Sequence, residues 1–184
     1  MAYNVPTYDS KKFSFGPGVL YIGVEGTTPL IEIGAVKGDA ELSIERTPLE
    51  VFAGSPQSKI AQYAIKEEVK LKVVGIEWNL DNLNYALGAG TTGASGAAQT
   101  FEFGGSMTLA NKAVRFVHRT PDGSTIDVQL FKCEGSGKIA ISFKETDMHE
   151  FPYEFHTLEG TSDFSNGALA ASKKHFKIIR TVAA

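Results

Sequence analysis

Apolar and polar residues alternate at period two along several short segments of the chain, a pattern typical of β-strands with one buried face. The clearest segment is 68–73, in which three aliphatic side chains face one way while a glutamate and two lysines face the other. Residues 41–47 alternate in the same manner. If the two segments pair, Glu41 and Glu45 face the lysines across the ladder, and such charge pairs help to fix the register.

Further segments also have strand-like patterns. Residues 113–120 and 125–132 flank 121–124, a Pro-Asp-Gly-Ser turn sequence, so they are predicted to form a hairpin. The other candidate strands are the short apolar or alternating segments 19–24, 31–33, 138–144 and 151–155. The proline in segment 151–155, Pro152, suits an edge strand or a bulge.

One segment, 79–87, has helical rather than strand periodicity. Three leucines fall on one helical face, Asn79 is a suitable N-cap, and Gly88 is a suitable terminator. Residues 88–100 then consist almost entirely of Gly, Ala, Thr and Ser, which predicts a flexible loop.

These elements predict a mainly β fold, an antiparallel β-sandwich or partly open barrel with one α-helix. The 184 residues suffice for one core. The predicted layout is an N-terminal arm (1–17), a β domain (18–159) and a C-terminal arm (160–184). Between the strands near 41–47 and 68–73 lies a connection, residues 47–64, that is far longer than a hairpin loop. We expect this connection to contact a neighbouring molecule.

The charge is distributed unevenly along the chain. The whole sequence carries −3, but residues 160–184 hold four basic residues against one acidic residue, a net of +3, which leaves −6 for the rest. A basic tail on an acidic body favours contact with another acidic surface, such as a second copy of the chain; the alternative is a solvated tail.

The composition also bears on the compartment. No apolar run approaches the roughly 20 residues that span a bilayer. The first six residues lack the features of a signal peptide. A single cysteine, Cys133, excludes an internal disulfide framework and is consistent with a reducing cytosol. No membrane association is therefore expected.

The motifs of catalysis and cofactor binding are weak. Residues 88–93 match G-x-G-x-x-G but follow a predicted helix instead of opening one, and 135–138 lack the first glycine and the hydroxyl of a phosphate loop. The four histidines have no zinc-site spacing, and nothing marks Cys133 as a nucleophile. We therefore expect no enzyme, no cofactor, no metal and no catalytic residue.

Several motifs in a fixed order carry a resemblance to a known family. They are Gly-Val-Leu-Tyr-Ile-Gly at 18–23, Ile-Gly-Ala-Val-Lys-Gly at 33–38, a long connection before a strand at 69–76, a helix ending Tyr-Ala-Leu-Gly at 85–88, and Phe-Pro-Tyr-Glu-Phe-His at 151–156. Together they resemble the major tail tube proteins of tailed bacteriophages, over roughly residues 15–160. The resemblance implies a virion structural protein, assembled in the host cytoplasm, that forms hexameric rings stacked into a hollow tube for DNA.

The resemblance also implies partners and contact residues. The partners are other copies of the chain, the tape measure, terminator and baseplate proteins, possible sheath subunits (the tail type is left open), and double-stranded DNA in transit. Residues 47–64 would be the loop that reaches the adjacent ring. The loop candidates are Glu50, Phe52, Ser55, Gln57, Lys59 and Gln62, and the C-terminal arm candidates are Lys173, Lys174, Lys177 and Arg180.

Simple geometry favours a shared barrel. A barrel of about eight strands is filled by its own side chains, so one copy cannot enclose DNA. Six copies lending about four strands each would form a barrel of ~24 strands and ~48 Å backbone diameter. Because DNA must slide, an acidic lumen is expected. Its candidates are Glu41, Ser43 and Glu45, since Leu42 and Ile44 occupy the opposite face of that strand; the lysines of 68–73 complicate this expectation.

Three alternatives remain open at this point. A type VI secretion tube protein or a tail terminator also forms hexameric rings. A monomeric β-sandwich binding module, for example for carbohydrate, would need an exposed aromatic platform. An enzyme is the third alternative.

Overall fold

The chain folds mainly into antiparallel β-strands, as predicted, with one α-helix in the part of the chain described here. A computed structural model describes residues 18–38, 40–77, 79–105, 109–136, 139, 141 and 149–183. Its strands are β1 (Gly18–Gly23), β2 (Ile31–Glu32), β3 (Glu41–Ala53), β4 (Ser58–Gly75), β5 (Gly90–Ser95), β6 (Ala98–Phe103), β7 (Lys112–Arg119), β8 (Thr125–Gly135), β9 (Phe151–Thr157) and β10 (Phe176–Thr181). Its helices are α1 (Leu80–Leu87) and the short 3-10 helix η2 (Ala171–Lys173).

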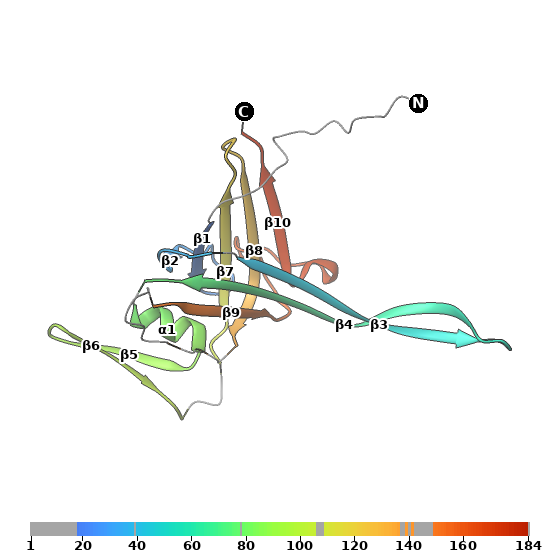
Figure 1. The fold of residues 1–184 in the computed structure, drawn as a ribbon, viewed down its shortest axis with the longest axis horizontal. Coiled ribbons are helices and arrows are strands. Elements are labelled where there is room, and N and C mark those ends of the chain that lie inside the picture. The colour runs from blue at the N-terminus through green and yellow to red at the C-terminus, as the bar shows by residue number, and fades with distance from the viewer. Residues whose placement is uncertain are drawn as a thin grey trace.

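The main sheet has the order β2-β1-β7-β8-β9-β4-β3, with β10 attached to β8. β8 is long enough to have two partners on one side. Its first half, from Thr125 to Leu130, pairs with β10, and its end, from Cys133, pairs with β9. The sheet therefore divides at β8, and Figure 1 shows β10 and β9 running in different directions from this point.

The core lies where β1, β4, β7, β8 and β9 meet. On β4 the aliphatic residues Val69, Leu71 and Val73 are at most 3% exposed, as the alternating pattern predicts. Across the ladder, Leu71 lies opposite Phe155 of β9, which is also fully buried. A smaller cluster on the other face of β8 packs around Phe131.

The helix prediction is confirmed in detail. The side chain of Asn79 accepts a hydrogen bond from the Asp81 N–H at 2.9 Å, and Gly88 has the left-handed φ of 70° that ends the helix. The helix is fixed to the sheet by Asn82, whose amide donates to the carbonyl of Ile33 at 2.7 Å. It crosses the end of β8 so closely that a Cβ on Gly135 would lie 1.9 Å from the Ala86 carbonyl oxygen.

Two segments predicted to be loops are strands instead. Residues 47–64 continue β3 and β4 as a long hairpin that turns at 54–57 and extends well away from the body (Figure 1). Bulges at Thr47/Pro48 and Val51/Phe52 break the period-two pattern, which is why the strands were hidden in the sequence. Residues 88–100 form most of the separate β5–β6 hairpin, because backbone pairing alone can order small polar residues.

The C-terminal segment is partly built into the sheet. β10 pairs with β8 over six residues, so this part of 160–184 belongs to the β domain and not to a separate arm. The predicted hairpin around 121–124 is formed by β7 and β8. The predicted N-terminal arm 1–17 and most of the predicted strand 138–144 lie outside the described residues.

Candidate assembly surfaces

The β3–β4 hairpin exposes an unusual amount of apolar surface. Among the described residues, six of the twelve exposed large hydrophobic side chains lie on it, with exposed fractions between 49% and 63%. Surface of this kind, carried away from the core on two strands, indicates a protein–protein contact site. The six residues are Ile44, Leu49, Phe52, Ile60, Tyr63 and Ile65.

The distal half of this hairpin has two chemically different faces. Leu49 lies directly opposite Tyr63, so an aliphatic and an aromatic side chain share one face. Glu50 lies opposite Gln62, and both of these side chains contact the ammonium of Lys59. Because successive strand residues point to opposite sides, the apolar pair and the polar group face away from each other.

The predicted loop residues are therefore divided between strands and turn. Glu50 and Phe52 lie on β3, Lys59 and Gln62 on β4, and Ser55 and Gln57 in the turn between them. The prediction passed over the apolar residues, among them Leu49 and Ile60. The signal was present, since a segment predicted to be an exposed connection contained several large apolar residues.

The three lumen candidates share one face of β3, as predicted, but that face is mixed in charge. Glu41 lies opposite Lys72, which agrees with the predicted charge pair. Glu45 lies opposite Glu68 and not a lysine, and Ser43 lies opposite Lys70, so this part of the prediction is wrong. The register thus places Ser43, and not a glutamate, beside Lys70.

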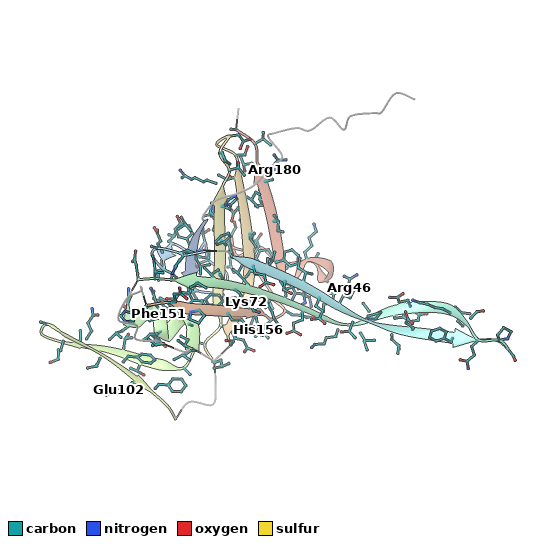
Figure 2. The ribbon with its side chains drawn as sticks, viewed as in Figure 1. Arg46, Lys72, Glu102, Phe151, His156 and Arg180 are labelled. Carbon is teal, nitrogen blue, oxygen red and sulfur yellow. The ribbon has the colours of Figure 1, made fainter. Side chains whose placement is uncertain are left out.

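Glu68 is the centre of an ion-pair cluster on this face. Its carboxylate lies 2.8 Å from the ammonium of Lys66 and 2.6 Å from that of Lys70, and these contacts lower its pKa from 4.5 to about 2. His156 of β9 lies 3.6 Å from Glu68 and 3.2 Å from Glu154. Across the ladder His156 lies opposite Lys70 of β4, and Figure 2 labels His156 and Lys72 on these two neighbouring strands. The lysines of this face are thus held beside carboxylates.

The predicted basic residues lie along the last part of the chain. Lys174 forms an ion pair with Glu159 at 2.8 Å. Lys177 lies on β10 opposite Gln129, and Arg180 lies near the other end of the same strand (Figure 2). Lys173 ends the short helix η2. The structure gathers these residues on and beside one exposed strand.

A cleft of about 520 Å³ lies beside the start of β10. Phe131, Leu169 and Phe176 give it an apolar lining, and Lys173, Lys177 and Asp163 also line it. The cleft lies on the face of β8 that is covered by the segment after β9, close to where the sheet divides. It offers room for an apolar side chain beside two positive charges.

Within the described residues, the chemical groups offer few other sites. No group of three or more His, Cys, Asp or Glu side chains is placed to hold a metal ion. Cys133 is fully buried, and burial raises the pKa of its thiol. None of the described helices has the length and apolar character needed to cross a membrane. The G-x-G-x-x-G stretch joins α1 to β5 and opens no helix.

Comparison with known proteins gives no family for this chain. No family model matches the sequence, and no curated protein matches it either. The function is therefore argued from the surfaces described above.

Proposed function

We propose that this chain is a virion structural protein of a tailed bacteriophage. It polymerises as stacked hexameric rings into the hollow tail tube, which conducts genomic DNA into the host. The observation that carries the proposal is the β3–β4 hairpin, which extends beyond the core with six exposed large apolar side chains. Such a hairpin has no function in an isolated molecule and is suited to reach a neighbouring ring.

The edges of the sheet also support assembly. β3 ends the sheet with 13 residues that have no partner strand on their outer side among the described residues. Long exposed edges are normally shortened, covered or closed, because they pair readily with other chains. A ring in which each copy covers the edge of the next removes this hazard and provides the shared barrel.

The face that holds Glu41, Ser43 and Glu45 is suited to the tube lumen. Two of its lysines are already engaged, since Lys66 and Lys70 lie 2.8 Å and 2.6 Å from the carboxylate of Glu68, and Lys72 lies opposite Glu41. An engaged lysine binds DNA phosphate less readily, so the duplex can slide. This lumen is mixed in charge, with its positive groups neutralised locally, in place of the purely acidic lumen expected from the sequence.

The remaining expectations follow from this role. The protein would work in the phage tail beside tape measure, terminator and baseplate proteins, with or without a sheath. A type VI secretion tube protein would form similar rings, and a tail terminator would form a ring that does not extend into a long tube. A β-sandwich binding module would remain a monomer.

Light scattering during gel filtration, combined with negative-stain electron microscopy of the purified protein, tests the proposal. We expect rings and hollow tubes whose length grows with protein concentration. A single species at the monomer mass of 19.8 kDa at every concentration would contradict the proposal. Rings that never stack would favour the terminator.

A further inference from the structure

Two strands of the sheet have unpaired outer edges with opposite charge. β3 carries three glutamates against one arginine, a net charge of −2. β10 carries one lysine and one arginine, a net charge of +2, and Lys173 and Lys174 directly precede it. In the part of the chain that the structure describes, β3 pairs only with β4, and β10 pairs only with β8.

From this complementarity we infer that β3 of one copy pairs edge to edge with β10 of the next copy. The inference rests on the proposed self-assembly and names the joint within it. Because a β-strand added to a free edge gains main-chain hydrogen bonds, this joint would extend the sheet from one molecule into its neighbour. The two edges are different surfaces, so the contact is heterologous and can close a ring.

The charges that define the joint are available for it. Glu41 and Glu45 form no ion pair with any described side chain. Lys173 and Lys177 likewise form no described ion pair. Pairing the two edges through these four side chains breaks no described ion pair inside either copy.

Apolar groups on the two strands fit the same arrangement. Ile178 of β10 is 48% exposed, and Ile44 of β3, between the two glutamates, is 58% exposed. The cleft beside Lys177 has an apolar lining in which one side chain of an added strand can be buried. The joint therefore combines strand pairing, opposite charge and burial of apolar surface, the components of a stable β-sheet contact.

A charge-swap experiment with the full chain tests the inference. One variant carries Glu41→Lys and Glu45→Lys, and the other carries Lys173→Glu and Lys177→Glu. In the first variant both edges are positive, and in the second the basic edge loses its net positive charge, so we expect the concentration required for assembly to rise in both, and roughly tenfold or more in the first. When the two variants are mixed in equal amounts, the exchanged positions of unlike copies again have opposite charges, so assembly should return at least in part.

The matched control is Glu32→Lys with Glu102→Lys, two exposed acidic positions outside both strands. It should assemble like the wild-type chain, and far-ultraviolet circular dichroism should be the same for all variants. If each charge variant assembles like the wild type, or if mixing restores nothing, the joint is wrong although the tube proposal stands. If the wild-type chain itself stays monomeric, both proposals fail.

Discussion

At the scale of single residues, Glu68 is a carboxylate held between two lysines. The neighbouring Lys66 and Lys70 lower its pKa from 4.5 to about 2. A carboxylate with a lowered pKa in the folded state stabilises the fold above its unfolded pKa, and this contribution is lost as pH falls toward the folded value. We therefore expect Glu68→Gln to flatten the loss of stability between about pH 4.5 and 2, as measured by urea unfolding at a series of pH values.

The exposed position of this cluster limits the effect, because solvent screens the ion pairs. Glu102→Gln is the matched control, since Glu102 is an exposed glutamate for which no ion pair is described. Its pH profile should follow the wild type. If Glu68→Gln also follows the wild type across this range, the ion pairs of Glu68 contribute nothing to stability.

A second prediction at this scale concerns Gly135. Gly135 is the last residue of β8 and lies beneath the C-terminal turn of α1. A Cβ there would lie 1.9 Å from a backbone oxygen of Ala86, which cannot move without displacing the helix. Gly135→Ala should lower the free energy of unfolding by about 1–3 kcal/mol. Ser95→Ala in the β5–β6 hairpin should change it little, and equal midpoints in urea for both variants would contradict the close approach.

At the scale of elements, the sequence predicts regular strands well and irregular strands poorly. Val69, Leu71 and Val73 alternate cleanly with charged residues, and β4 is buried there as expected. Earlier in the same strand, Ile60 and Ile65 are the extra residues at the two bulges. They interrupt the alternation of apolar and polar side chains, so no local pattern reveals the hairpin. Pairing of β5 with β6 depends on backbone hydrogen bonds between small residues, which hydrophobic periodicity cannot detect.

The same limits apply to the candidate site. Charges on one face, such as Glu41 and Glu45, could be grouped from alternation alone. Their exact partners depend on the register: with Glu41 opposite Lys72, regular antiparallel pairing places Glu45 opposite Glu68. The sequence also did not predict that β10 is a strand of the sheet. A short basic segment is equally consistent with a solvated tail, and only its pairing with β8 distinguishes the two.

The hairpin gives a prediction at the element scale. Phe52→Ser with Tyr63→Ser should leave the free energy of unfolding within about 0.5 kcal/mol of the wild type, because both side chains are more than half exposed. The same change should prevent stacking of rings, since it removes apolar surface that only a neighbour can bury. Urea unfolding and negative-stain microscopy measure the two effects. Phe103→Ser, an equally exposed aromatic on β6, is the control and should assemble normally.

At the scale of the whole molecule, division of the sheet at β8 explains how one small chain presents two different edges. If β10 instead lay between β8 and β9, both of its edges would be paired and neither could meet another copy. Because β8 exchanges one partner for the other near Phe131, β10 is left with an outer edge that no described strand covers, while β3 is open at one end of the main sheet. Two unlike edges on one chain are the requirement for repeated head-to-tail contacts.

The two kinds of contact should respond differently to salt, which gives a prediction for the assembly as a whole. Sodium chloride at about 1 M shortens the Debye length to roughly 3 Å, so it should weaken the charged β3–β10 joint. Ammonium sulfate at the same ionic strength screens charge equally but also strengthens apolar burial, so it should preserve more of the hairpin contact. We therefore expect light scattering to report smaller assemblies in chloride than in sulfate. Equal size in low salt and in both concentrated salts would show that the charged edges contribute no measurable stability to the joint.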